Sequence, residues 1–453
     1  MSFVQGLLGA RSHLAFLVGL AGAFAVVRAT SGIEAPPRPT IELTYRAHDL
    51  PLRGRAPLSE SERRLAEAAW SYFERSTDPH TGLATSVRGY PSTTMWEVGS
   101  QLMAILAAED LELAQRSDTR RRLRHALTSL SALPLCERGL PNKAYHTRTL
   151  AMVDYDNALV PRGIGWSALD IGRLLVPLSL IARRAPELAP LVEHVVARWN
   201  LDALSDASAL RGSMRRPDGA LATHQEGRLG YEQYAAKSLL AWGVPATTAL
   251  DYNRHLAWRK VAGEPVPHDD RLPRDHGGAH NAVLSEPWLL DGIEFGLDAT
   301  TGALARAVLA AQERRFRETG RLTAISEDSI DHPPGFAYSA VLNGDEVWTA
   351  FLPDGTSAPE ELTFSVKAAV GWAALFAGSY PDRLFEAASE VGSSGEGLYA
   401  GRYDASGRLN AAVSLNTNAV VLEALAYRVH GPFFRPVARA REQRMHAELE
   451  RRP

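Results

Sequence analysis

Residues 59–73, with the sequence SESERRLAEAAWSYF, indicate how the main part of the chain folds. Ser59 followed three residues later by Glu62 is typical of a capping box at a helix N-terminus. The apolar positions from Leu65 to Phe73 keep three- and four-residue spacing, which predicts an amphipathic helix. From this point onward the dominant pattern of the sequence is helical.

Helical periodicity recurs along the chain. The expected helices cover about 95–114, 119–132, 167–184, 187–199, 230–242, 286–297, 301–317, 363–378, 382–390 and 416–429, with further helices near 246–260 and 334–342. Long links rich in Gly, Pro, Asp and His separate them, which favours antiparallel helix pairs and functional loops. No fixed repeat of a solenoid is visible. We therefore predict an all-α domain over residues 59–435, an (α/α)6 toroid with long loops at one end and little β-structure.

The ends of the chain differ from this domain. Within residues 1–35, the apolar run 14–27 is shorter than the about 20 residues that a bilayer span needs. It predicts a secretory signal, with an uncleaved membrane anchor as the alternative. Residues 36–58 read as a linker with one short strand, and 436–453 as a charged tail. We expect a periplasmic or otherwise extracytoplasmic protein, anchored to the inner membrane if the N-terminus is retained.

Composition excludes several classes of function. The 453 residues carry 49 Lys and Arg against 52 Asp and Glu, a formal net charge of −3, which gives no reason to expect nucleic acid as a partner. The single cysteine, Cys136, excludes an intrachain disulfide and a cysteine-based zinc site. Neither a phosphate-binding loop nor a nucleophile elbow is present. We expect no cofactor.

Aromatic residues stand beside carboxylates at the starts of several expected helices. Aromatic rings pack on the apolar faces of sugars, while carboxylates and amides bind hydroxyl groups, and cleavage of a glycosidic bond needs two carboxyl groups. The sequence therefore predicts a site for an oligosaccharide or polysaccharide. The expected binding residues are Trp96, Glu97, Trp166, Asp170, Tyr231, Tyr234, Glu286, Trp288, Asp291, Tyr399, Asn416 and Asn418. A further loop combines Glu327, Asp328 and Asp331 with Phe336 and Tyr338.

Each of these residues also has a structural interpretation. Glu97 and Glu232 could cap their helices, and Asp170 could pair with Arg173 across a helix surface. Asn416 and Asn418 could be cap or turn residues. A separate metal-dependent hydrolase hypothesis uses His268, Asp270, His276 and His280, but two glycines between the last two histidines argue for a loop. We therefore predict no metal.

Five segments, in order, resemble the DUF3131 family. They are STTMWEVGS (92–100), LDIGRLL (169–175), GYEQYAAK (230–237), SEPWLLDGIEFG (285–296) and LNTNAVVLEAL (415–425). This family is similar in pattern to glucoamylase-like families that include β-1,2-glucanases, which are (α/α)6 toroids. The resemblance implies an exported bacterial protein that acts on a polysaccharide or oligosaccharide without an obligatory metal.

The resemblance also suggests catalytic residues. It places Glu232, within the Tyr-Glu-Gln-Tyr motif, as the general acid, and leaves Asp404, Asp154 and Asp156 as candidates for the base. Trp96, Trp166 and Trp288 would be sugar platforms. The sequence departs from the family pattern at Ala400, where a polar residue is expected, and at Glu97, where Asp is common. Those departures leave open a non-catalytic glycan-binding or polysaccharide-export protein.

Overall fold

The computed structural model describes residues 50–273 and 280–434, and these contain twelve α-helices arranged in two layers. The six inner helices are α4 (Met95–Asp110), α6 (Ala168–Arg184), α8 (Tyr231–Ala241), α10 (Glu286–Leu290), α12 (Val366–Leu375) and α14 (Leu415–His430). The six outer helices are α3 (Glu60–Ser76), α5 (Arg116–Ala132), α7 (Ala189–Ala197), α9 (Thr247–Leu250), α11 (Ala299–Thr319) and α13 (Ser379–Val391). Outer and inner helices alternate along the chain.

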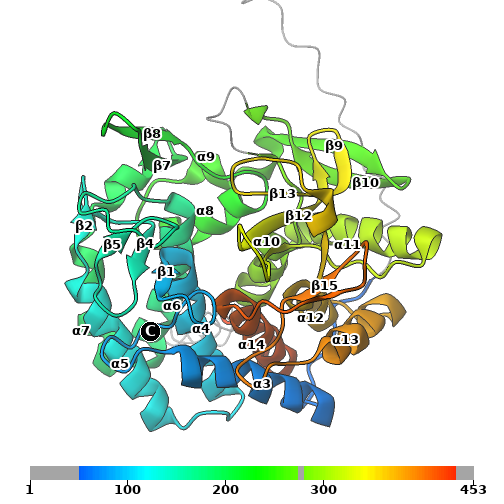
Figure 1. The fold of residues 1–453 in the computed structure, drawn as a ribbon, viewed down its shortest axis with the longest axis horizontal. Coiled ribbons are helices and arrows are strands. Elements are labelled where there is room, and N and C mark those ends of the chain that lie inside the picture. The colour runs from blue at the N-terminus through cyan, green and yellow to red at the C-terminus, as the bar shows by residue number, and fades with distance from the viewer. Residues whose placement is uncertain (1–49, 274–279, 435–453) are drawn as a thin grey trace, which may run out of the picture. The chain divides into compact units, whose positions relative to one another are not determined.

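The inner helices close a ring. Each packs against the next in chain order, and α14 completes the circuit by packing between α12 and α4, as Figure 1 shows. The expected ring of six helix pairs is therefore present. A π-helical turn, η5 (Asp291–Phe295), continues α10.

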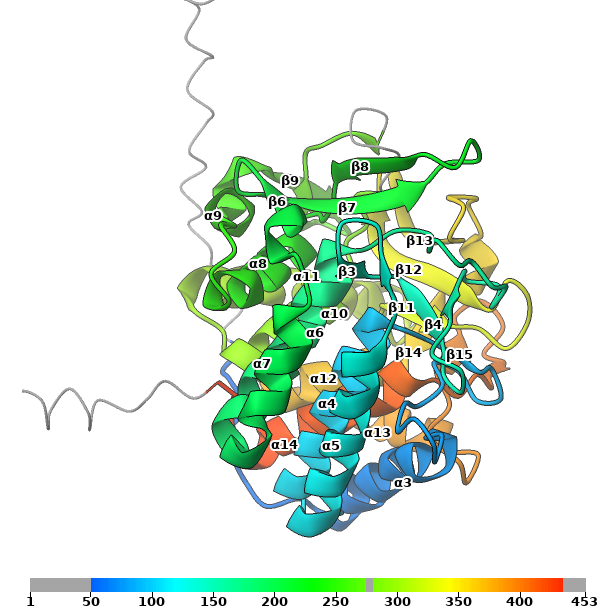
Figure 2. The same cartoon turned by 90° about the vertical axis from the view of Figure 1, so that its left-hand side faces the viewer.

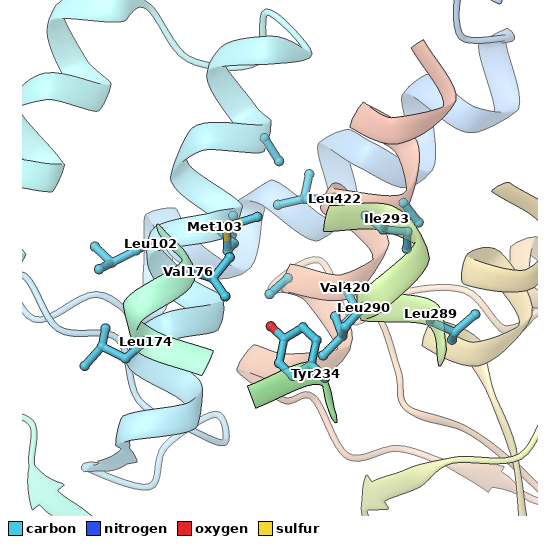
Figure 3. Close-up of a cluster of buried hydrophobic side chains, with 14 of the residues drawn as sticks. Leu102, Met103, Leu174, Val176, Tyr234, Leu289, Leu290, Ile293, Val420 and Leu422 are labelled. Carbon is cyan, nitrogen blue, oxygen red and sulfur yellow. The ribbon is translucent and has the colours of Figure 1, made fainter. Parts of the chain in front are cut away.

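The two layers follow from their sequences. In α3, Ser59 and Glu62 form the predicted capping box, and the helix buries one side only. In α4 every residue from Val98 to Ala108 is buried, as expected for a helix that is apolar all round. Figure 3 shows the interior of the ring, where side chains of the inner helices meet. Labelled there are Leu102, Met103, Leu174, Val176, Tyr234, Leu289, Leu290, Ile293, Val420 and Leu422.

The expectation of little β-structure is wrong, because the links before the inner helices form six small antiparallel sheets. The first three are β1 (Ser92–Thr94) with β4 (Ala144–His146) and β5 (Met152–Val153), β2 (Leu135–Cys136) with β3 (Leu140–Pro141), and β6 (Ser205–Asp206) with β7 (Ala209–Arg215) and β8 (Leu221–Gln225). The others are β9 (Leu256–Val261) with β10 (Glu264–Asp269), β11 (Glu327–Ser329) with β12 (Phe336–Asn343) and β13 (Glu346–Phe351), and β14 (Thr363–Ser365) with β15 (Gly401–Tyr403) and β16 (Leu409–Asn410). Figure 2 shows β7, β8 and β12 above helices α4 and α6.

One of the expected helices is replaced by a strand, and another is shortened. The segment 334–342 forms β12, whose register against β13 pairs Tyr338 with Phe351. The segment 246–260 contains the short α9 and a 3-10 turn, η3 (Tyr252–Arg254), before β9 begins. Cross-strand pairing within a hairpin outweighs the weak helical preference of such short apolar runs.

The N-terminal part of the described chain crosses the opposite end of the ring. The backbone N–H of Arg53 donates to Leu375 at the end of α12, and that of Ala56 donates to Arg428 near the end of α14. The expected signal (1–35), the strand at 40–46 and the tail (436–453) lie outside the described residues. Among the helices of the described residues, none combines the length and apolarity that a membrane crossing requires.

Candidate functional site

The N-terminal ends of the inner helices bring polar and aromatic side chains together. Each contributes at least one from its first three residues: Trp96 and Glu97 from α4, Asp170 from α6, Tyr231 from α8, Glu286 from α10, Lys367 from α12 and Asn416 from α14. Helix N-termini carry partial positive charge, which favours carboxylates at this position. The sheets lie at the same end of the ring, and β11 adds Glu327 and Asp328.

One group of carboxylates surrounds a single buried lysine. We call Lys367, Glu286, Glu327 and Asp328 the Lys367 cluster. The Lys367 ammonium contacts Glu286 and lies 3.8 Å from Asp328 Oδ1, and all three side chains are buried. Glu327 is partly exposed and accepts a hydrogen bond from the Tyr231 hydroxyl. The cluster thus has one cation for three carboxylates.

This imbalance raises proton affinity in the cluster. Burial and the charge of Glu286 raise the pKa of Glu327 to about 8, against the opposing effects of Lys367 and Tyr231. Burial also raises the pKa of Asp328 to about 7, although Lys367 opposes the shift. Near neutral pH the cluster therefore retains a proton, and Glu327 is its partly exposed member.

A second group of carboxylates lies at the starts of α4 and α6. We call Glu97, Asp170 and Glu226 the Asp170 group. Burial and the negative charge of Glu226 raise the pKa of Asp170 to about 7, opposed by Lys143. Burial raises the pKa of Glu97 to about 7. Glu97 Oε2 is 2.9 Å from the Thr94 amide in a capping box, and Glu226 accepts the Ala168 amide at the start of α6.

Aromatic side chains lie beside the two groups. The rings of Trp96 and Tyr231 meet edge to face, with centroids 5.4 Å apart. Burial raises the pKa of Tyr338, and Glu327 and Asp170 both add to this shift, so the hydroxyl lies within the electrostatic reach of both carboxylate groups. Tyr155, in the loop after β5, is 60 % exposed. Local burial of its hydroxyl and the charge of Asp170 raise its pKa.

A buried polar network links the Lys367 cluster to the middle of the ring. Asn416 Nδ2 donates to Glu286 over 2.8 Å, and Ser100 Oγ donates to Asn416 Oδ1 over 3.1 Å. Arg173 Nε donates to Ser100 Oγ over 3.4 Å. Through Lys367, Glu286, Asn416, Ser100 and Arg173, five of the six inner helices contribute to one hydrogen-bonded chain, and Tyr234 on α8 joins it through Arg173.

The network ends in a fully buried group around Arg173. Its guanidinium contacts Glu294, lies 2.6 Å from Glu423 Oε1 and donates to the Tyr234 hydroxyl over 2.9 Å. Two buried glutamates share one guanidinium, and burial raises the pKa of Glu423 to about 7. The sequence interpretation of Arg173 as a surface partner of Asp170 is wrong, because Arg173 points into the ring and has no exposed surface.

The structure brings part of the predicted site together. Trp96, Glu97, Asp170, Tyr231, Glu286 and Asn416 all lie at the N-terminal ends of the inner helices described above. Tyr234 lies deeper, in the Arg173 group. Asp291 pairs instead with Lys237, with Nζ 2.6 Å from Oδ1.

The other predicted residues lie in different surroundings. The Trp166 and Trp288 side chains are buried in the hydrophobic core and present no face to solvent. Asn418 is buried and hydrogen bonds to the backbone of Leu398 and Ser414, over 2.8 and 2.7 Å. Tyr399, between α13 and β15, is partly exposed and packs against the core. The structure links none of these four to the two carboxylate groups.

The four residues predicted as catalytic have other partners. Glu232 is 4 % exposed and forms an ion pair with Arg271, with 2.6 Å between Oε2 and Nη2. Asp404 is held by Arg315 and Arg321, which lower its pKa against the effect of burial. Asp154 accepts two backbone amides of the turn that contains the exposed Asp156. Their catalytic roles remain predictions, and no contact places them in the carboxylate groups.

Several residues of the site were not selected from the sequence. Glu327, Asp328 and Tyr338 share the aromatic and acidic loop noted there, which was the available signal. Lys367 is the one charged residue within the apolar run FSVKAAVGW (364–372), and a lone charge on an otherwise buried helix could have identified it. Glu226 carried no comparable signal.

The proposed metal ligands do not converge in the described part of the chain. His268 is bound to the Asp269 carbonyl, His280 stacks on Phe351, and His276 lies outside the described residues. A different set, His255, Asp269 and Asp270, has ligand atoms within 4.8 Å of one another. Arg271 bonds to both Asp269 oxygens, so this set already contains a cation.

Comparisons with solved structures support the toroid. A putative glucoamylase from Bacteroides caccae superposes with a TM-score of 0.59 at 12% identity, covering 83% of this chain and 94% of that one. An endo-β-1,2-glucanase from Chitinophaga pinensis, bound to sophorotriose and glucose, gives 0.57 at 12% identity, with coverage of 83% and 94%. The endo-β-1,2-glucanase of Talaromyces funiculosus in complex with sophorose gives 0.53 at 12% identity, with coverage of 85% and 87%. At these identities the likeness establishes a glucoamylase-like fold.

The chain belongs to the DUF3131 family, whose description is "Protein of unknown function (DUF3131)" and whose pattern matches residues 64–431. This confirms the resemblance noted in the sequence. No curated protein sequence matches the chain.

Proposed function

We propose that this protein is a glycoside hydrolase that cleaves a bacterial glucan or exopolysaccharide. The observation that carries the proposal is the pair of carboxylate groups at the N-terminal ends of the inner helices, where Tyr231 bonds to Glu327 and packs edge to face against Trp96. Glycoside hydrolysis needs one carboxyl group that is protonated and another that activates water or attacks the sugar. Solved structures of the same fold that contain β-1,2-linked sugars support a glucan as the substrate.

The environments of the carboxylates suggest their roles. Glu327 is the acid, because its pKa of about 8 keeps it protonated at neutral pH and its Oε2 has no hydrogen-bond partner within the protein. Asp170 is the base or nucleophile. All three members of the Asp170 group are partly exposed, but Glu97 and Glu226 are bound to backbone amides at helix starts. Trp96, Tyr231 and Tyr338 would pack against the apolar faces of sugar rings.

Export is a further part of the proposal. The apolar run at residues 14–27, followed by the proline-rich segment near Pro36, supports passage across the inner membrane. A periplasmic location, with or without retention of the N-terminus as an anchor, would place the protein where bacterial exopolysaccharides are assembled and trimmed.

A direct assay tests the proposal. The chain is incubated with β-1,2-glucan, other bacterial glucans and exopolysaccharides, and released oligosaccharides are detected by mass spectrometry. We expect products from at least one polymer, and loss of these products in Glu327→Gln and Asp170→Asn. Glu318→Gln, which changes an exposed carboxylate on α11, is the matched control and should cleave normally. Unchanged cleavage in Glu327→Gln would contradict the assignment.

A non-catalytic glycan-binding protein is the second candidate. It is favoured by the pKa of about 7 for Asp170, because a base with that pKa is only half ionised at neutral pH. Retention of the protein on one glycan without any released product would select this alternative. The same carboxylates and aromatic rings would then bind sugar hydroxyls and ring faces.

A further inference from the structure

Lys143 lies between the starts of two inner helices. It directly precedes β4, and its backbone N–H donates to the carbonyl of Gly165, ahead of α6, over 2.9 Å. Its own carbonyl accepts from the Met95 amide at the start of α4 over 3.3 Å. These two bonds place Lys143 beside the Asp170 group, whose acids begin the same two helices.

The backbone around Lys143 is firmly held. Asn142, the preceding residue, has no exposed surface. Its Nδ2 donates to the carbonyls of Ala144 and Val153 over 2.7 and 3.0 Å, and its Oδ1 accepts the Ile164 amide over 2.7 Å. The Lys143 side chain therefore extends from a fixed point.

The Lys143 side chain is buried but unpaired. The residue is 8 % exposed, and no residue that the structure describes forms a hydrogen bond or an ion pair with its ammonium group. Lys237 and Lys367, in contrast, are paired with Asp291 and Glu286. Burying an unpaired cation is costly, and the positive ends of two helices add to the cost. Such departures from local stability are typical of functional sites.

The ammonium group of Lys143 lies within electrostatic reach of the Asp170 group. It opposes the rise in the pKa of Asp170, and it acts on His224 of β8 with the opposite sign to Glu226. Within the described chain it still forms no ion pair with either acid. A hydrogen-bond donor and acceptors that are close without pairing leave room for a group that both accepts and donates.

A sugar hydroxyl has this chemistry. Its oxygen accepts from an ammonium group, and its hydrogen is donated to a carboxylate. An anionic group fits less well, because the three carboxylates of the Asp170 group repel it. Tyr155 adds an aromatic face, since its ring is 60 % exposed and its hydroxyl is under the influence of Asp170.

We propose that Lys143 is a substrate-binding residue that donates to a hydroxyl of a neutral sugar, while a carboxylate of the Asp170 group accepts from the same hydroxyl. The inference rests on the proposed function, because it names the residue that orients a sugar ring at Asp170. A glycan-binding protein would hold the ring in the same way.

Two lysines with opposite pairing provide the test. Lys143→Met removes the unpaired ammonium group, and Lys237→Met, the matched control, removes one that lies 2.6 Å from Asp291 Oδ1. Both are made in the full chain carrying Glu327→Gln, so that bound glycan is not cleaved. Calorimetry measures the dissociation constant for β-1,2-gluco-oligosaccharides, or for oligosaccharides of another polymer selected by the assay above, and unfolding temperatures are recorded in parallel.

The two variants should behave oppositely. Lys143→Met should weaken binding about 10- to 100-fold and keep or raise the unfolding temperature. Lys237→Met should bind as the parent chain does and unfold at a lower temperature. Lys143→Arg, which keeps the charge and the donors, should bind more tightly than Lys143→Met.

A second measurement needs no lysine variant. The chain has four lysines, at positions 143, 237, 260 and 367, and Lys260 is exposed. Acetic anhydride is applied to the Glu327→Gln chain with and without saturating oligosaccharide, and mass spectrometry locates the acetyl groups. Bound oligosaccharide should abolish acetylation of Lys143 and leave that of Lys260 unchanged.

Several results would overturn the inference. They are an unchanged dissociation constant or a lower unfolding temperature in Lys143→Met, acetylation of Lys143 that the oligosaccharide does not affect, and tighter, Lys143-dependent binding of a uronic acid oligosaccharide than of its neutral counterpart. Failure of the proposed function looks different, because Lys143→Met would weaken binding while the native chain cleaves no glycan. If no glycan binds the chain, both proposals are wrong.

Discussion

Two buried acidic clusters near the start of α8 have opposite chemical character. In the first, Arg271 lies between Asp269 and Glu232, and all four carboxylate oxygens have partners, including Gln225 Nε2 at 3.1 Å and the Leu229 amide at 2.9 Å. In the second, Lys367 is the one cation for three carboxylates, and Glu327 Oε2 and both Asp328 oxygens have no hydrogen-bond partner. A satisfied ion-pair network has little reason to bind a ligand, whereas unsatisfied acids with raised pKa values are typical of functional sites.

The proton affinities reflect part of this difference. Arg271 lowers the pKa of Asp269 despite its burial, whereas burial still raises the pKa of Glu232. Burial raises the pKa of Glu327 to about 8. Five well-placed donors of a guanidinium can satisfy two carboxylates at once, but an ammonium has only three and cannot bond equally to three acids. The ratio of cations to carboxylates and the geometry of the guanidinium or ammonium donors, rather than burial alone, therefore distinguish the two clusters.

The largest expected difference concerns activity. Glu327→Gln should lower glycan cleavage about 10²- to 10⁴-fold, because it removes the proton donor. Glu232→Gln should keep most of the activity, because its carboxylate is bound to Arg271 rather than to substrate. Rates of product release for both variants, at equal protein concentration, provide the comparison. A larger loss in Glu232→Gln would return the acid role to that residue.

The second prediction concerns stability. Arg271→Met should destabilise the fold by about 3–5 kcal/mol, because it leaves two buried carboxylates without their cation. Denaturant unfolding of the variant and the native chain measures this difference. A loss below about 1 kcal/mol would show that the Arg271 cluster is more hydrated than its contacts indicate.

The third prediction concerns pH. The pKa of Glu327 rises from its ordinary value of 4.5 to about 8 in the folded chain. Its contribution to the stability of the fold is therefore complete below pH 4.5 and is lost as the pH rises through about 8. Asp269 has a lowered pKa, so its contribution is present above its ordinary value of 3.8 and is lost as the pH falls through its folded-state pKa. Unfolding temperatures between pH 5 and 9 should therefore fall with pH, and less steeply in Glu327→Gln. An identical slope in that variant would contradict the assigned protonation.

The smallest expected effect comes from Tyr231→Phe. The Tyr231 hydroxyl donates to Glu327 and lowers its pKa, so its removal should raise that pKa. The alkaline limb of the cleavage profile should move upward by less than about one pH unit. Tyr252→Phe, which changes a tyrosine beside α9 and far along the chain from this cluster, is the control. A downward shift in Tyr231→Phe would mean that the hydroxyl stabilises the protonated acid.

Much of the fold follows from local sequence patterns. The Ser59–Glu62 capping box and the apolar runs of the inner helices predict the helix pairs, and pairing them predicts the ring. Strands such as β2 and β5, two residues long, contain too few positions for an alternating pattern to show. The segment that forms β12 is a run of small and apolar residues that suits a helix as well as a strand, so the sequence predicts a helix there.

The site could be predicted only in part, because local patterns show which residues begin the helices but not which partners they meet. Glu97, Asp170, Tyr231, Glu286 and Asn416 begin inner helices, and a ring brings those ends together, so their convergence follows from the fold. The partner of each acid depends on tertiary contacts. Glu232 and Arg271 are 39 residues apart, and no local pattern predicts that they meet.

The pH dependence of kcat/KM on a cleaved glucan tests the central claim most directly. With Asp170 near a pKa of about 7 and Glu327 near about 8, we predict a narrow bell whose maximum lies between these values. Its alkaline limb should be absent from the residual activity of Glu327→Gln. A maximum near pH 4 to 5, where ordinary carboxylates titrate, with little activity at pH 7.5, would contradict the account.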